Sequence, residues 1–225
     1  MDGAIEAIRS RGALDRDERQ VKDGILRMGS IVETQIRTAI RAFVDRDQVL
    51  AMDVVAGDAL VNDAQHAVSE AVAMTIATQS PVARDLRFLL ALNHVGYELE
   101  RIGDHAASVA KQVRRLAEEP ALPAAAVLGH MGGLAADLVR DVLGAVIDID
   151  AAVARTVASR DDEIDHDYHV LFSEVIATMQ ADPGSVERGT RVILTAHWIE
   201  RIGDRVTNIA EDVVYLASGE IEDLN

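Results

Sequence analysis

The chain has 225 residues, of which 49% are hydrophobic and 3% aromatic, so it can bury a core and its composition favours helices over strands. The formal net charge of −16 disfavours binding to the phosphate backbone of nucleic acids, and the absence of cysteine excludes disulfides, thiolate catalysis and cysteine-ligated zinc. No signal segment or membrane span is recognisable, so we expect a cytoplasmic protein. Because of its negative charge, we also expect that it binds no nucleic acid.

Three helices are predicted in the first half of the chain. Hydrophobic residues recur every three or four positions from Ile25 to Phe43, from Leu50 to Thr75 and from Leu86 to Leu116. The first two helices are expected to meet near Asp45 to Asp47. The third is expected to begin at Ser80-Pro81, with serine as its N-cap and proline as its first residue. This order predicts an antiparallel three-helix bundle.

The second half of the chain repeats the first. The motif ERIGD at Glu100 to Asp104 returns 100 positions later at Glu200 to Asp204. Before the third helix of each half the offset is 103, and it relates Met28-Gly29 to Met131-Gly132, Asp45 and Asp47 to Asp148 and Asp150, and Asp58 to Asp161. A period this long indicates a duplicated domain. We therefore expect an all-α protein of two tandem, pseudo-symmetric three-helix bundles with six long helices, over residues 1–119 and 124–225.

The acidic residues of each ERIGD motif are spaced so that they can share a cation. A Glu and an Asp four residues apart lie on one side of a helix, about 6 Å from each other. The second helix of each bundle carries a matching row, which falls at the same height when residues are counted from the intervening turn. The candidate metal ligands are Glu100 and Asp104 opposite Asp58 and Asn62 in the first half, and Glu200 and Asp204 opposite Asp161 and Asp165 in the second.

The two predicted sites differ in their surroundings. Oxygen ligands suit Mg²⁺, Mn²⁺, Fe or Ca²⁺, and zinc is a further option if His66 or His169, at the ends of the acidic rows, takes part. The second half extends the ERIGD stripe with Asn208 and Glu211, whereas Lys111 replaces the acid in the first half. Because lysine repels a cation, we expect the first site to bind metal more weakly.

Two alternatives to a regulatory metal site stay open. Glu163 and His166 form an ExxH motif, as in carboxylate-bridged di-metal enzymes built in helical bundles, although such sites need the motif on two helices. The acidic rows are also compatible with a metal-free helical scaffold. No nucleophile and base have a usable spacing and no nucleotide-binding motif occurs, so we expect no catalytic residue and no enzymatic activity.

Three segments resemble the PhoU family, with a similarity that extends from about Leu26 to Glu220: SPVARDLRFLLAL, ELERIGDHAASVAK and WIERIGDRVTNIAEDVVYLASGE. The resemblance implies a cytoplasmic negative regulator of phosphate uptake and of the phosphate-starvation response. Such a regulator couples the phosphate ABC transporter to a sensor histidine kinase at the inner face of the membrane. The resemblance also implies a homodimer and metal ions on the ExxxD motifs, as multinuclear clusters in some members, with Fe, Zn, Mn or Mg as candidates.

Overall fold

Helices form nearly all of the described chain, which is residues 2–224 of a computed structural model, with side chains described from residue 11 onward. The first half contains α1 (Asp2–Asp45), α2 (Gln48–Gln79) and α3 (Ala83–Leu116). The second half contains α4 (Leu128–Asp148), α5 (Ala151–Ala158), α6 (Asp161–Ala181) and α7 (Val186–Ser218). Short 3₁₀ helices, η1 (Pro123–Val127) and η2 (Pro183–Ser185), precede α4 and α7. The prediction of an all-α fold is confirmed.

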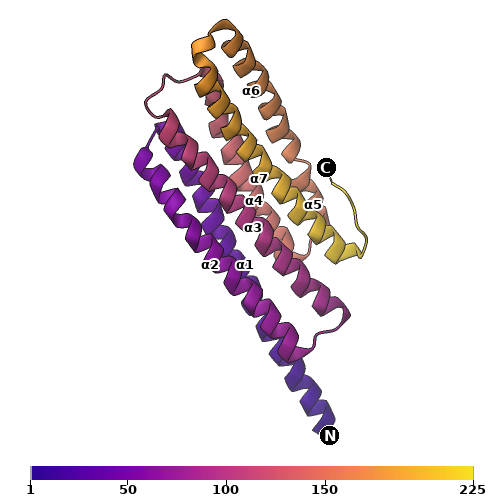
Figure 1. Cartoon of the computed structure of the whole chain (residues 1–225). Helices are drawn as coiled ribbons and strands as arrows, with labels where there is room; N and C mark the ends of the chain where they lie inside the picture. Colours follow the sequence, from indigo (N-terminus) through magenta and orange to yellow (C-terminus); the bar gives the residue numbers. More distant parts are fainter. Residues whose placement is uncertain (1, 225) are drawn as a thin grey trace.

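Four helices form the centre of the molecule, and the others flank them. Within the halves α1 packs on α3 and α4 on α7, while between the halves α1 packs on α4 and α3 on α7. Figure 1 shows α2 along one edge and α6 along the other, with the N-terminal part of α1 extending past the end of the bundle. None of the described helices combines the length and the apolar character that a membrane span requires. The division into two domains at residues 119–124 stays a prediction.

The turn between the first two helices has the same construction in both halves. Asp47 caps α2 by accepting hydrogen bonds from two backbone N–H groups at 2.9 and 3.0 Å, and Asp150 caps α5 in the same way at 2.9 and 3.1 Å. The preceding residues, Arg46 and Ile149, both have left-handed backbones, with φ of 56° and 53°. The helix junction predicted near Asp45 to Asp47 is therefore confirmed, together with its repeat.

The start of α3 differs from the prediction. Ser80 is not the N-cap of α3, because it has a left-handed backbone and closes α2 by donating its N–H to the Ile76 carbonyl at 3.2 Å. The terminal carbonyls of α2 need partners, and a left-handed residue supplies one. Helix α3 then begins at Ala83, after Val82, whose side chain cannot cap. In the second half the side chain of Asp182 caps η2, by accepting a hydrogen bond from the Gly184 N–H at 3.0 Å, and α7 follows without a side-chain cap of its own.

The second helix of the second half is interrupted, where the sequence predicts an unbroken one. Helix α5 ends at Ala158, and α6 begins at Asp161. Between them the Arg160 N–H bonds to the Val157 carbonyl at 3.1 Å, and the Ser159 hydroxyl bonds to the Thr156 carbonyl at 3.0 Å. Serine hydroxyls that bond to backbone carbonyls compete with the helical pattern. The interruption lies immediately before a predicted metal ligand, Asp161, whereas α2 runs unbroken through Asp58.

Two glycines at equivalent positions allow α1 and α4 to approach closely. A Cβ atom added at Gly29 would overlap the Leu143 side chain, and one added at Gly132 would overlap Ile40. The two contacts correspond, because adding 103 to positions 29 and 40 leads to 132 and 143. Gly29 and Gly132 are thus equivalent positions that meet equivalent side chains, Leu143 and Ile40, as a twofold relation between the halves requires.

Adding one methyl group at this interface should have opposite effects at neighbouring positions. We expect Gly132→Ala to lower the free energy of unfolding by about 1–3 kcal/mol, because the new methyl group overpacks Ile40. Gly133 has no atom within 4 Å of an added Cβ, so Gly133→Ala should raise stability by roughly 0.5–1 kcal/mol through its better helix propensity. Urea unfolding of both variants measures the difference, and equal stabilities would contradict the proposed contact.

Candidate metal centres

The predicted ligands of the second half lie together between α6 and α7. Asp161 and Asp165 of α6 interact electrostatically with Asp204 of α7. Glu200 of α7 interacts electrostatically with all three of these carboxylates. Asp161 is 7% exposed, and its Oδ1 is buried without a hydrogen-bond partner. The structure therefore brings four carboxylates from two helices to one region, as the matching of residue heights predicts.

The glycine of the second ERIGD motif makes room for this arrangement. The Asp161 carboxylate lies where a Cβ atom on Gly203 would be, so any side chain at this position would displace it. Its second oxygen, Oδ2, accepts a hydrogen bond from the Thr207 hydroxyl at 3.3 Å. The carboxylate is thereby held against the backbone of α7.

Burial and mutual repulsion disfavour negative charge in the second site. Burial, followed by the charges of Asp165 and Asp204, raises the pKa of Asp161 to about 7. Burial and the charge of Asp204 likewise raise the pKa values of Asp165 and Glu200. Arg201 offers Asp204 only a distant ion pair, at 3.6 Å. A cation at this position would relieve repulsion that the protein itself compensates poorly.

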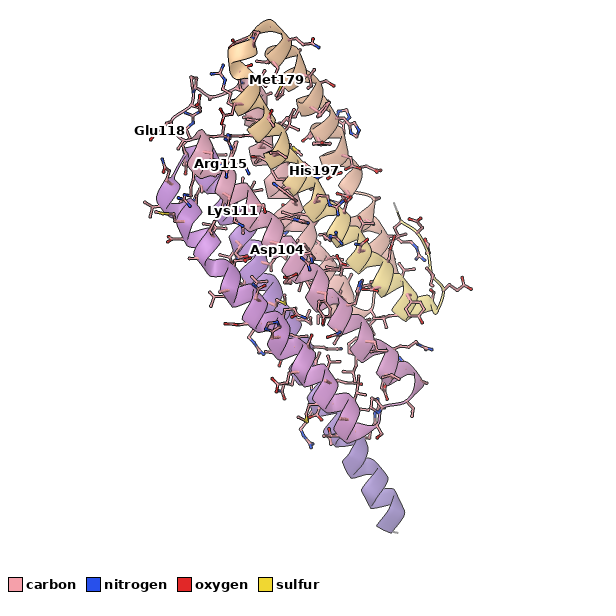
Figure 2. The ribbon with its side chains drawn as sticks, in the orientation of Figure 1. Asp104, Lys111, Arg115, Glu118, Met179 and His197 are labelled. Atoms are coloured by element: carbon pink, nitrogen blue, oxygen red, sulfur yellow. The ribbon has the colours of Figure 1, made fainter. Side chains whose placement is uncertain are left out.

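The first site is less buried and better neutralised. Asp58 of α2 lies opposite Asp104 of α3, and burial followed by this charge raises the Asp58 pKa, while Lys111 lowers it. Arg101, which is exposed, folds back to bind Asp104 at 3.0 Å and Glu100 at 3.4 Å. Figure 2 shows Asp104 and Lys111 in succession along α3. Arginine and lysine thus already supply positive charge at this site.

Two buried polar residues beside the sites escaped the sequence analysis. Gln35 of α1 is 7% exposed, has no hydrogen-bond partner for either amide atom, and lies 3.3 Å from the position of a Cβ on Gly103. The other is Thr207, which binds Asp161. Their counterparts in the other half are Leu138 and Ala107. Comparing the two halves position by position would have singled them out, because each places a polar residue where the repeat has an apolar one.

Some predicted neighbours of the second site turn elsewhere. The Asn208 amide donates to Glu98 of α3 at 3.4 Å, and Glu211 accepts a hydrogen bond from the Leu224 N–H at 3.0 Å. The prediction that Asn208 and Glu211 extend the second site is therefore wrong, because both side chains bind elsewhere. His66 and His169 are exposed at the ends of their rows, and Asn62 is half-buried beside the first site. Glu163 and His166, which form the ExxH motif, are exposed on α6.

The contact between α3 and α7 lies between the two sites. It contains a polar pair of residues and, at the equivalent positions, an aromatic pair. Glu98 of α3 is buried and accepts from Arg205 at 3.4 Å, while the counterpart pair, His105 and Trp198, stacks with ring centroids 5.3 Å apart. Burial lowers the pKa of His105 to about 4, so this ring is neutral at physiological pH. Trp198 therefore has a packing role at this contact.

The carboxylates of the second site are suitable metal ligands, but their oxygens do not converge on a single ion position. In the part of the chain with described side chains, no three acidic or histidine residues are placed to hold an ion as they stand. The buried Oδ1 of Asp161 has no hydrogen-bond partner, and Oε2 of Glu200 has only an ion pair with His197, at 3.2 Å. These oxygens, with the raised pKa values of Asp161 and Glu200, nevertheless suit a hard cation. The metal site therefore stays a prediction, with Asp161, Asp165, Glu200 and Asp204 as its residues.

Comparisons with known proteins give matches over nearly the whole chain. A family model described as the PhoU domain matches residues 25–113 and again 128–213. A phosphate-specific transport system accessory protein PhoU homolog of Clostridium acetobutylicum is 33% identical over 217 residues, which cover 96% of this chain and 99% of that protein. The Pseudomonas aeruginosa protein of the same description is 34% identical over 200 residues, covering 88% and 83%.

Solved structures show the same architecture. The crystal structure of PhoU from Pseudomonas aeruginosa superposes with a TM-score of 0.87 at 33% identity, covering 92% of this chain and 99% of that one. The phosphate transport system regulatory protein PhoU from Streptococcus pneumoniae also superposes with a TM-score of 0.87, at 30% identity, covering 93% and 99%.

Bound metal should depend more on the second site than on the first. We expect Asp204→Ala to lower the Mn²⁺ or Fe content of protein purified without chelator more than Asp104→Ala does, because Arg101 and Lys111 already neutralise the first site. Glu174→Ala, which removes an exposed acid from α6 away from the site, is the control for lost charge. Elemental analysis measures the content. A larger loss in the Asp104 variant would reverse the ranking of the sites.

The stability of metal-free protein should reveal the buried carboxyl group. The folded-state pKa of Asp161, about 7, exceeds its ordinary value of 3.8, so the folded state holds the proton more tightly and stability falls as pH rises toward 7. Asp161→Asn removes this titration. In EDTA we expect the stability of wild type relative to the variant to fall from about pH 4 upward, and the advantage of the variant to grow by on the order of 2–3 kcal/mol between about pH 5 and about pH 8. Urea unfolding at both pH values checks this, and parallel pH profiles would contradict it.

Proposed function

The chain belongs to the PhoU family, and we propose on this basis that it is a regulator of phosphate transport. The family assignment confirms the resemblance seen in the sequence. The observation that carries the proposal is the duplication: the family model matches both halves, each with its own ERIGD motif on its last long helix, α3 or α7. Relatives that match most of the chain are described as accessory or regulatory proteins of phosphate transport systems.

The proposed role is negative regulation when phosphate is plentiful. In this role the protein lowers phosphate uptake and represses the phosphate-starvation response by linking the phosphate ABC transporter to a sensor histidine kinase. It acts in the cytoplasm as a homodimer and reaches the inner face of the membrane through these protein partners. The net charge of −16 is consistent with a preference for protein surfaces over anionic lipid.

Metal binding would serve structure and signalling in this proposal. Asp161 and Asp165 of α6 with Glu200 and Asp204 of α7 would hold one or more ions of Fe, Zn, Mn or Mg, and Asp58, Asn62, Glu100 and Asp104 would form the weaker first site. A bound ion supplies positive charge that neutralises the carboxylates. The protein's own contribution is to present acids from two helices, so that neutralisation favours close packing of α6 on α7.

The proposal includes no catalytic step. Its rivals are a di-metal enzyme and a metal-free scaffold, and both can be distinguished from it. Turnover of a substrate by metal-loaded protein would favour the enzyme. Protein that retains no stoichiometric metal after purification without chelator, but still regulates, would favour the scaffold.

A deletion strain tests the regulatory role. In phosphate-rich medium we expect loss of the gene to raise expression of a phosphate-starvation reporter or the phosphate content of the cells. Wild type should restore repression, and Asp161→Asn/Glu200→Gln should restore it less well. The control is Glu70→Gln/Glu174→Gln, which removes two acidic charges from exposed positions of α2 and α6. An unchanged reporter and unchanged phosphate content in the deletion strain would count decisively against a regulatory role.

A further inference from the structure

An apolar cavity of about 410 Å³ lies at the end of the molecule where the two halves are joined. Phe43 at the end of α1, Leu116 at the end of α3 and Val192 near the start of α7 line it. The connector between the halves, residues 117–127, covers it with residues that include Leu122 and Ala125. Its volume falls in the range of small-molecule sites.

The connector is anchored, so the cavity has a defined wall. Leu122 is only 6% exposed and belongs to the hydrophobic core, which holds the connector against the bundle. Walls from three helices and the connector enclose the space on several sides, which suits a compact ligand better than an extended peptide. Because the lining is mainly apolar, a ligand with a hydrocarbon or aromatic body would gain free energy by displacing water from it.

Two arginines add positive charge to this apolar cavity. Arg46 lies in the turn after α1, and within residues 11–224 no ion pair or side-chain hydrogen bond engages its guanidinium group. Arg188 of α7 also lines the cavity, and its Nε is buried without a hydrogen-bond partner. Asp182 is its ion-pair partner, at 3.3 Å. In a chain with a net charge of −16, two guanidinium groups beside one apolar space select for an anionic group.

The duplicated half shows that the fold does not require these charges. The counterpart of Arg46 is Ile149, which has the same left-handed backbone, and the counterpart of Arg188 is Phe88. Both counterparts are apolar, so arginine is not needed for the turn or for the start of the helix. The basic character continues beside the cavity on α3, where Figure 2 shows Lys111 and Arg115 along the turns that lead to the connector.

We propose that this cavity binds a small apolar carboxylate, with the hydrocarbon or aromatic body between Phe43, Leu116 and Val192 and the carboxylate against Arg46 and Arg188. Guanidinium groups bind carboxylates through two parallel hydrogen bonds, and a low-dielectric wall strengthens this interaction. The site is separate from the carboxylate rows and does not depend on metal binding. It provides a place where an organic anion influences the junction of the two halves.

Calorimetric titration with decanoate, below its micelle concentration, tests the proposal, with decan-1-ol as the neutral analogue. We expect saturable binding of one decanoate per chain and binding of decan-1-ol that is roughly tenfold or more weaker, because the alcohol lacks the charge. Arg46→Gln/Arg188→Gln should weaken decanoate binding by a similar factor. Arg84→Gln/Arg87→Gln, at the opposite end of the bundle, should leave the affinity unchanged.

Filling the cavity is the second arm of the test. Leu116→Trp should abolish decanoate binding, whereas the same change at the counterpart position, Leu216→Trp, should preserve it. If Leu116→Trp fails to fold by circular dichroism, Ala125→Phe fills the cavity from the connector instead. The proposal is overturned if wild type shows no saturable binding at millimolar decanoate. It is equally overturned if the alcohol binds as well, or if a folded filled variant keeps wild-type affinity.

Discussion

The antiparallel packing of α1 on α4 is the contact on which the rest of the structure depends. Gly29 and Gly132 permit it, because each leaves space that a large side chain of the other helix occupies. This contact and that of α3 on α7 join two bundles that are each too thin to bury all their apolar surface alone. With the four central helices held in this way, α2 and α6 are left at the two edges, where one face of each meets the ERIGD helices.

The position of α2 and α6 explains why the two carboxylate sites have diverged. Each edge helix needs only an apolar stripe toward the centre, so the acids beside the stripe can change without loss of the fold. In the second half the break before Asp161 and the space over Gly203 accompany a deeply buried carboxylate. In the first half Gln35 occupies the corresponding interior and Arg101 covers the acids from outside. One scaffold thus presents a buried, poorly neutralised site and an open, compensated one.

The junction of the halves adds a different chemistry. Duplication brings the end of α1, the end of α3 and the start of α7 to one place, and the connector must cross it. The connector is rich in alanine and proline, and its small side chains leave an apolar space rather than filling it. Arginine at two positions where the repeat has isoleucine and phenylalanine marks this end as different from its counterpart.

The sequence by itself determined most of the helices, their repetition and the residues of the acidic rows, because these follow from periodicity and spacing along the chain. The helix junction near Asp45 to Asp47 and its repeat were readable for the same reason, although the caps that Asp47 and Asp150 form there were seen only in the structure. The sequence did not determine the start of α3 or the break between α5 and α6. Only the tertiary structure decided that Asp161 is buried while Asp58 is not, that Asn208 turns to Glu98, and that Arg46 and Arg188 line one cavity. These outcomes depend on which side chains from distant segments compete for the same space, and no pattern within a single helix records that competition.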